Sequence, residues 1–159
     1  MIGLLLPLLL QVTPVAPIVK GTGLPPPSGD EAAVMAPVTA ILKGIADNDG
    51  GAILAASRSE GGLTAVFDAN GKRVVNRITW AEFATGLKKE GTDRYEERLF
   101  NPAIEVEGDV GFVWARFTVL KNGVPQHCGY DLFDVVRENG QWKVLNVTWS
   151  QRTTGCTAQ

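Results

Sequence analysis

The candidates for acid–base chemistry lie in the last third of this 159-residue chain. His127 is the only histidine, and Asp131 follows it four positions later within a run that fits a β-strand. On a strand the two side chains share a face, but their Cα atoms lie about 13 Å apart. They are too far apart for a hydrogen-bonded pair, so each is a separate candidate for proton transfer.

Arg116 offers a second interpretation of Asp131. Counting back through the Asn122-Gly123 turn places Arg116 diagonally from Asp131 on the neighbouring strand. An ion pair between them would satisfy two partly buried charges, lower the pKa of Asp131 and weaken it as a general base. His127 can likewise be a hydrogen-bonded structural residue. Both alternatives stay open for each residue.

Four long strands are expected to carry these groups. Period-two patterning covers residues 95–107, 110–120, 124–137 and 141–152, and the short connections between them, two of them Asn-Gly, join antiparallel neighbours. Upstream, helices are expected from Asp30 to a break at residues 48–51, over 52–57, and from a Thr79–Glu82 capping box to about Lys89. A hairpin of residues 63–67 and 74–78 precedes the third helix. This order predicts an α+β domain.

Counting residue pairs outward from the two Asn-Gly turns divides the sheet into two faces. The first is aromatic and polar, and it supplies the candidate catalytic residues Asp131 and His127 and the candidate ligand-binding residues Trp114, Arg116, Phe133, Trp142, Asn146 and Thr148. The second is almost wholly apolar and includes Val113, Phe117, Leu132, Leu145, Val147 and Trp149. A one-residue bulge would exchange parts of these two lists.

Either face could lie beneath the helices. We expect the first face there, because its aromatic side chains would otherwise expose a large apolar area to water. Ligand pockets also combine apolar walls with a few polar groups, as this face does. The alternative makes the first face a solvated surface. If the first face is inside, a second copy of the chain would cover the apolar second face, so a homodimer through the sheet is expected.

The pattern favours one function over two others. We expect binding of a small, largely apolar molecule in an aromatic-floored pocket, without catalysis. The alternative is an isomerase, dehydratase or hydrolase that uses Asp131 or His127 for proton transfer, and a third reading is a protein-interaction module. An unpaired buried carboxylate would favour the enzyme, whereas an Asp131 locked to Arg116 would favour the binder.

The composition excludes several classes. Hydrophobic residues make up 45% of the chain and charged residues 20%, with a net charge of −2, so the chain is expected to fold and lacks the basic excess that nucleic-acid binding needs. One histidine and two cysteines leave little for a metal site, and no cofactor motif is present. No run of eighteen apolar residues exists, so no membrane span is expected.

The first 29 residues predict export. Residues 2–10 form an apolar run of signal-peptide length, although no basic residue precedes it and no clean cleavage site follows, and a proline-rich linker covers residues 12–28. The folded domain is expected over residues 30–156, in the periplasm or secreted. Cys128 and Cys156 would then form a disulfide that pins the C-terminal tail to the sheet; two free thiols in a cytoplasmic protein are the alternative.

The element order and the segment HCGYDLFDVVRENGQWKVLNVTWSQRTTGC resemble the nuclear transport factor 2-like superfamily, in particular its exported bacterial SnoaL-like branch. The resemblance covers about residues 30–156. It implies three N-terminal helices on a long, curved, mostly antiparallel sheet, a cone or half-barrel with a pocket at its open end, and frequent dimers through the sheet. It implies no particular reaction, because that superfamily holds isomerases, dehydratases, hydrolases, cyclases and binding modules on one scaffold.

Overall fold

The structure, a computed structural model, describes residues 29–87 and 93–158. The signal-like run, the proline-rich linker and the expected end of the third helix near residue 89 lie outside the described residues. None of the helices described is long and apolar enough to cross a membrane.

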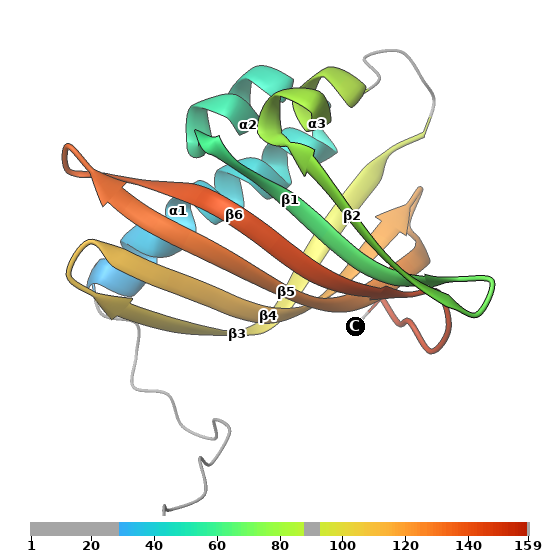
Figure 1. Ribbon diagram of the computed structural model, residues 1–159. Helices are drawn as coiled ribbons and strands as arrows, with labels where there is room; N and C mark the ends of the chain where they lie inside the picture. Colours follow the sequence, from blue (N-terminus) through green and yellow to red (C-terminus); the bar gives the residue numbers. More distant parts are fainter. Residues whose placement is uncertain (1–28, 88–92, 159) are drawn as a thin grey trace, which may run out of the picture.

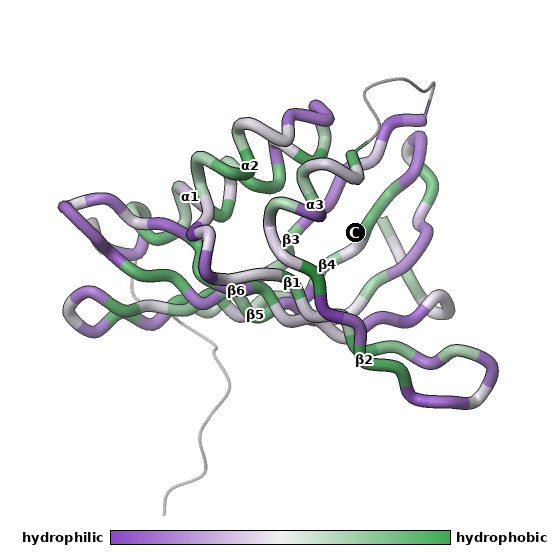
Figure 2. Tube along the Cα trace, turned by 45° about the horizontal axis from the view of Figure 1, so that its top comes forward, coloured by the Kyte–Doolittle hydropathy of each residue, from purple (hydrophilic) through white to green (hydrophobic). Residues whose placement is uncertain are grey.

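The described residues form three helices and six strands, and all three helices come before the third strand. Their order is α1 (Gly29–Ala46), α2 (Gly50–Ala56), β1 (Ser57–Ala69), β2 (Lys72–Thr79), α3 (Trp80–Gly86), β3 (Tyr95–Glu107), β4 (Val110–Lys121), β5 (Val124–Glu138) and β6 (Gln141–Arg152). The strands form one sheet in the order β2-β1-β6-β5-β4-β3, in which only β1 and β6 run parallel. The helices lie over the concave side of the curved sheet (Figures 1 and 2). The expected α+β fold class is confirmed.

Local chemistry explains where several elements begin and turn. The predicted capping box is present at α3, where the Thr79 hydroxyl accepts a hydrogen bond from the Glu82 amide and the Glu82 carboxylate accepts one from the Thr79 amide. Asn122 and Asn139 have positive φ angles of 53° and 52°, and each is followed by a glycine at positive φ. These are the two-residue turns that a tight hairpin requires.

The apolar stripe of α1 packs against the concave face of the sheet. Val34, Val38 and Ile41 are fully or almost fully buried, and they join buried side chains of β4, β5 and β6 in one core. Asp30 and Glu31 lie in the first turn of this helix, where negative charge favours the helix dipole. The core therefore lies between the helices and the concave face, and it leaves the convex face open.

Two bulges, in β5 and β6, and a third in β3 between Phe100 and Ala103 change the strand register that the turns alone predict. Lys121 pairs with Val124 as expected, but beyond Leu120 one residue of β5, Gln126, has no partner on β4, so Val119 pairs with His127 and Ala115 with Asp131. The bulge is next to Pro125, which lacks the amide hydrogen that the ladder needs. The prediction that Trp114 and Arg116 share the face of Asp131 is therefore wrong.

The second bulge lies in β6. Glu138 pairs with Gln141 as expected, but Asp134 pairs with Asn146 and Val135 with Val144, so Leu145 is the extra residue. Its carbonyl oxygen accepts a hydrogen bond from the Trp80 indole nitrogen at 2.9 Å. β1 comes so close here that a Cβ atom on Gly61 would lie 1.6 Å from the same oxygen. The bulge turns Asn146 and Thr148 outward and Val147 and Trp149 inward, which reverses the prediction for all four.

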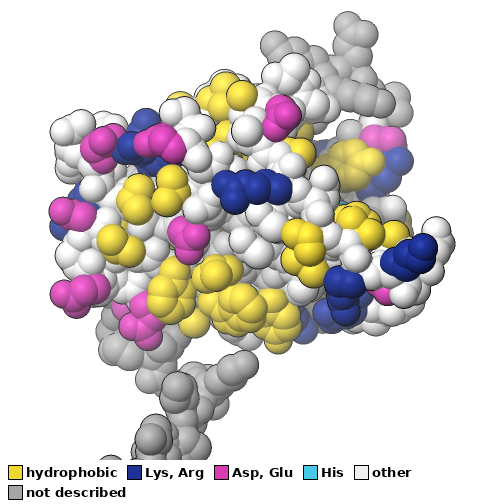
Figure 3. Space-filling view, viewed as in Figure 1, with side chains coloured by type: hydrophobic (Ala, Val, Ile, Leu, Met, Phe, Trp, Pro, Cys, Tyr) yellow, Lys and Arg dark blue, Asp and Glu magenta, His cyan; other side chains and the backbone are white. Residues whose placement is uncertain are grey.

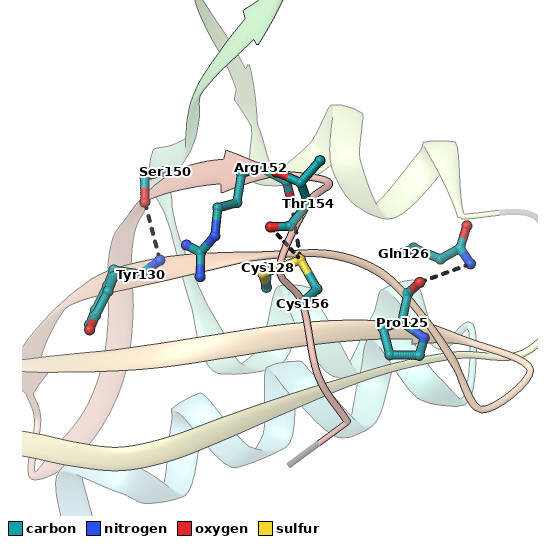
Figure 4. The surroundings of a disulfide bond; sticks show 8 residues. All are labelled: Pro125, Gln126, Cys128, Tyr130, Ser150, Arg152, Thr154 and Cys156. Atoms are coloured by element: carbon teal, nitrogen blue, oxygen red, sulfur yellow. Dashed lines mark hydrogen bonds between the residues drawn. A yellow bond between two sulfur atoms is a disulfide. The ribbon is translucent and has the colours of Figure 1, made fainter.

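The C-terminal tail crosses the convex face of the sheet. The sulfur atoms of Cys128 and Cys156 are bonded at 2.14 Å, which is the pairing expected from the two cysteines (Figure 4). Further on, the Ala158 carbonyl accepts a hydrogen bond from Arg98 of β3. Thr118 lies between Cys128 and Arg98 in the strand register and is only 3% exposed. The tail thus covers this end of the convex face.

Candidate functional site

The candidate site is a cavity of about 310 Å³ between the helices and the concave face of the sheet. Helices α1 and α3 form one wall, and strands β3 to β6 with Leu63 of β1 form the other. Most of its lining is apolar, and six of its residues are aromatic. The described lining consists of Ile41, Leu42, Ile45, Asn48, Leu63, Trp80, Phe83, Leu87, Tyr95, Glu97, Phe117, Val119, His127, Asp131, Phe133, Val147, Trp149 and Gln151.

Two carboxyl groups interact inside this cavity. Asp131 of β5 is 3% exposed, and its side chain shares a hydrogen bond with that of Glu97 of β3. Two carboxylates can share a hydrogen bond only if one of them is protonated. Gly129 lies between His127 and Asp131 on the strand, and a Cβ atom there would lie 1.8 Å from the Ser150 carbonyl oxygen of β6, so β5 and β6 approach closely at this point.

The protein environment raises the pKa of both carboxyls. Burial is the largest cause for Asp131, and the nearby charge of Glu97 and the hydrogen bond with it raise its pKa further, well above its ordinary value. Burial also raises the pKa of Glu97, while the hydrogen bond with Asp131 opposes this rise. Asp131 Oδ2 is buried and has no hydrogen-bond partner among the described residues. Apart from the proton shared with Glu97, the Asp131 carboxyl thus receives no hydrogen bond from the described residues.

His127 lies in the same cavity but makes no pair with the acids. Its ring contacts Phe117 edge-on with the centroids 5.9 Å apart. Burial lowers the pKa of His127, which favours the neutral imidazole. The strand register places Val119 between His127 and Glu97. His127 is therefore available as a neutral donor or acceptor beside the acid pair.

The structure brings only three of the eight predicted catalytic and ligand-binding residues to the cavity: His127, Asp131 and Phe133. Trp114 and Arg116 lie on the convex face, where Trp114 stacks on Tyr130 with the centroids 5.2 Å apart. Arg116 lies over the ring of Phe100, with its guanidinium carbon 4.7 Å from the centroid. The proposed Asp131–Arg116 ion pair is therefore wrong.

The other three predicted residues also lie outside the cavity. Asn146 donates a hydrogen bond to Asp134 on the convex face, and Thr148 is exposed there. Trp142 packs at the edge of the core beneath the guanidinium of Arg137, which lies 5.1 Å from its ring centroid. The β6 bulge precedes Asn146 and Thr148 along the pairing count and turned both to the convex face, whereas Trp142 lies before the bulge and stays on the core side.

Glu97 is the candidate site residue that the sequence did not reveal. It lies in a strand with three other acidic residues, and its spacing alone does not distinguish it from Glu96. Register does, because Glu97 pairs with Val119, which points into the cavity. The signal that could have found Glu97 is Asn101-Pro102 at the β3 bulge, where Asn101 has a positive φ of 49°. Pro125 near the β5 bulge and the Gly61-Gly62 pair opposite the β6 bulge could have corrected the other two registers.

The convex face carries an apolar patch, which we define as Phe100, Phe112, Trp114, Tyr130 and Leu132. Trp114 is 40% exposed, and Phe112 and Tyr130 are similarly exposed. Figure 3 views this side of the sheet and shows hydrophobic side chains gathered in one continuous area near its lower edge, with acidic side chains to the left. Such a patch on a free surface is typical of an interaction site.

No metal centre is formed by the described residues, among which no three histidine, cysteine or acidic side chains gather. The chemical groups that line the cavity are its acid pair, its histidine and its aromatic rings.

Comparisons with known proteins identify the fold. No known family model matches the chain, and no curated protein sequence matches it significantly. A solved structure from Novosphingobium aromaticivorans, the beta subunit of a candidate aromatic-ring-hydroxylating dioxygenase, is similar, with a TM-score of 0.64 and 14% identity over 81% of this chain and 93% of that chain. A nuclear transport factor 2-like protein from Cytophaga hutchinsonii aligns with a TM-score of 0.63 and 12% identity over 79% of this chain and 100% of that one.

A third structure, from Nostoc punctiforme, has unknown function and a cystatin-like fold. It aligns with a TM-score of 0.61 and 15% identity over 79% of this chain and 92% of that one. At such identities the likeness shows the fold. The chain has the nuclear transport factor 2-like fold, as its sequence pattern predicted. Its place in the exported SnoaL-like branch stays a prediction.

Proposed function

We propose that this domain binds a small, largely apolar molecule in the cavity beneath α1 and α3, with Asp131 as its polar anchor. The observation that carries the proposal is the buried, unpartnered Oδ2 of Asp131 in an otherwise apolar cavity of about 310 Å³. Cavities of this kind and size are typical of small-molecule sites. A ligand donor at Oδ2 would satisfy an atom that is otherwise costly to bury.

Titration with N-phenyl-1-naphthylamine, an uncharged dye that fluoresces in apolar surroundings, tests the binding. Val147→Phe should weaken the binding about tenfold or more, because the larger ring enters the cavity. Thr148→Phe is the matched control, since the neighbouring side chain of the same strand is exposed on the convex face. Equal dye binding by both variants, or no binding by the unaltered protein, would contradict the proposal.

A second candidate function is proton transfer by the Glu97–Asp131 pair. Two observations favour this function: no cation pairs with Asp131 among the described residues, and the pKa of Asp131 is raised. A carboxyl with a raised pKa works as an acid or base nearer neutral pH. Substrates would be apolar carbonyl compounds or alcohols in an isomerase or dehydratase type of reaction. His127 would assist as a neutral hydrogen-bond partner.

A screen for deuterium incorporation next to the carbonyl of apolar ketones in heavy water tests proton transfer directly. Asp131→Asn should slow any exchange by about 100-fold or more, whereas it should leave binding of the uncharged dye in place. Asp134→Asn, on the convex face of the same strand, is the matched control. If exchange survives Asp131→Asn unchanged, Asp131 is not the base.

Export to the periplasm or the exterior is part of the proposed function. The Cys128–Cys156 bond supports it, because disulfides persist in oxidising compartments. The apolar run at residues 2–10 supports it from the sequence. N-terminal sequencing of the protein recovered from the periplasmic fraction of a Gram-negative host should begin beyond residue 11, and recovery of the full-length chain from the cytoplasm would contradict export.

We also propose a homodimer through the convex face, now with different residues from those first expected. Arg116 lies at one end of the apolar patch, and Glu105 lies at the other end, next to Phe112 in the strand register. A two-fold axis through the patch would bring the Arg116 of each copy toward the Glu105 of the other. Such a self-complementary arrangement of charge around an aromatic centre is what an isologous interface needs.

Light scattering after size exclusion tests this interface. Arg116→Glu or Glu105→Arg alone should shift the protein toward the monomer, and the double exchange should restore the dimer. Val75→Glu is the control, because this apolar side chain is 66% exposed on β2, away from the patch. A monomeric wild-type protein at high concentration would contradict the dimer.

A further inference from the structure

The groups that can carry a full charge at neutral pH in the described lining of the cavity are acidic. Its acidic groups are Glu97 and Asp131, and no lysine or arginine is among its described lining residues. His127 and Tyr95 are the other titratable side chains that face the acid pair, and burial favours the uncharged form of His127. The described lining residues of α1, α3, β1, β4 and β6 contribute no titratable group. Lys121 lies near the ring of Tyr95 but forms an ion pair with Asp93 outside the cavity.

The walls around this acid pair are rich in aromatic rings. Trp80 and Phe83 come from α3, Tyr95 and Phe117 from β3 and β4, and Phe133 and Trp149 from β5 and β6. Aromatic faces attract cations, and the attraction is largest where water is excluded. A cation that leaves water for this cavity would therefore recover part of its lost hydration from the rings and part from the carboxyls.

We infer that the cavity selects organic amines with an apolar body, whose cationic nitrogen would replace the proton shared by Glu97 and Asp131 and donate to Asp131 Oδ2. This inference rests on the proposed binding function and adds the charge of the ligand to it. On binding, the ammonium group brings its positive charge to the pair, and the pair releases its shared proton to the solvent. Both carboxylates are then ionised against one cation.

Other ligand classes fit the same cavity less well. An anionic ligand would place like charges together in a site without a cation among its described residues, which is costly in a low-dielectric environment. A neutral alcohol could donate to Oδ2, but hydrogen bonds between charged groups are roughly twice as strong as neutral ones. The positive charge of the nitrogen is therefore the property by which the site selects its ligand.

Three probes with the same apolar body test the inference: 4-phenylbutylamine, 4-phenyl-1-butanol and 4-phenylbutyrate. Displacement of the uncharged dye by each probe at pH 7 should rank the amine about tenfold or more above the alcohol, with the carboxylate weakest. Calorimetry in buffers of different ionisation enthalpy should detect a proton released when the amine binds and none when the alcohol binds. Amine affinity should therefore rise with pH while the amine stays protonated.

Variants separate this inference from the proposed function. Asp131→Asn should remove the preference for the amine and the proton release but keep alcohol binding, whereas Asp134→Asn on the convex face should change neither. Glu97→Gln, as a second isosteric variant, should abolish the proton release. Alcohol binding equal to amine binding, or an amine preference that survives Asp131→Asn, would overturn the inference alone. If none of the three probes displaces the dye, the inference fails, and if the dye itself does not bind, the proposed function fails as well.

Discussion

The indole nitrogen of Trp80 donates a hydrogen bond to the carbonyl oxygen of Leu145, 2.9 Å away. Trp80 is the first residue of α3 and is 1% exposed, and Leu145 is the extra residue of the β6 bulge. A bulge frees backbone groups from the ladder, and this bond satisfies one of them in the interior. One side chain of the helical layer therefore helps to hold the register that turns Val147 and Trp149 toward the cavity.

Loss of this hydrogen bond should destabilise the fold. Trp80→Phe keeps an aromatic ring but leaves the Leu145 carbonyl without its partner, so the free energy of unfolding should fall by about 1–3 kcal/mol. Urea unfolding measures this. Trp114→Phe, at an exposed position, should change stability by only about 0.5 kcal/mol. Equal effects at the two positions would show that the hydrogen bond does not contribute.

Close approach of β1 to the bulge should make Gly61 irreplaceable. A Cβ atom there would lie 1.6 Å from the Leu145 oxygen, so Gly61→Ala must push the two strands apart and should cost about 3 kcal/mol or more. Gly86→Ala is the control, because a Cβ atom at Gly86 meets nothing within 4 Å. Thermal unfolding compares the two, and an unchanged melting temperature for Gly61→Ala would refute the close approach.

The acid pair should make stability depend on pH in a defined direction. Asp131 and Glu97 have raised pKa values in the folded chain, against ordinary values of 3.8 and 4.5. Their protonated forms favour the folded state, so this contribution is complete below those ordinary values and is lost as the pH rises through the folded pKa values. The lowered pKa of His127 acts in the opposite direction, since its contribution is lost as the pH falls below 6.5.

Comparison of two variants isolates the contribution of the acid pair. The free energy of unfolding of Asp131→Asn, minus that of the wild type, should increase between pH 4.5 and 8 in urea titrations. Groups that do not interact with Asp131 cancel in this difference, so it reports the pair of Asp131 and Glu97. Asp134→Asn, which alters a convex-face carboxyl, should show no such increase. A difference for Asp131→Asn that stays flat or decreases would contradict a buried, proton-sharing pair.

The disulfide should stabilise the domain through its C-terminal tail. Breaking the Cys128–Cys156 bond opens a loop with a sequence separation of 28 residues, which should lower the free energy of unfolding by about 2–4 kcal/mol. Hydrogen exchange should increase at Thr118 and Leu120 of β4, which are buried at this end of the convex face. Reductant should have no further effect on Cys156→Ser. Identical stability with and without reductant in the wild type would contradict the prediction.

The fold could be predicted from the sequence because its signals are local. The Asn-Gly dipeptides specify tight turns, the Thr79–Glu82 box specifies a helix start, and the alternation of residues after Tyr95 specifies strands. The ends of the four long strands match the structure to within one residue. Each of these features depends on the conformational preferences of neighbouring residues, so no distant contact was needed to infer it.

The candidate site could be predicted only in part, because it depends on which face each residue occupies. His127, Asp131 and Phe133 were placed correctly, but Trp114 and Arg116 were not, and Glu97 was missed. In a strand, one extra residue reverses every side chain beyond it.

Chain order and the composition of each segment thus determined the α+β class, the order of the elements and the pairing of the two cysteines. Only the tertiary structure decided the β6 bulge, because Trp80, distant in sequence, donates to its carbonyl and β1 packs beside it, whereas the β5 bulge lies next to Pro125. The Leu145 bulge needs Trp80 and Gly61 in place before its carbonyl can leave the ladder. The bulge between Phe100 and Ala103 of β3, and not the periodicity, turned Glu97 toward Asp131.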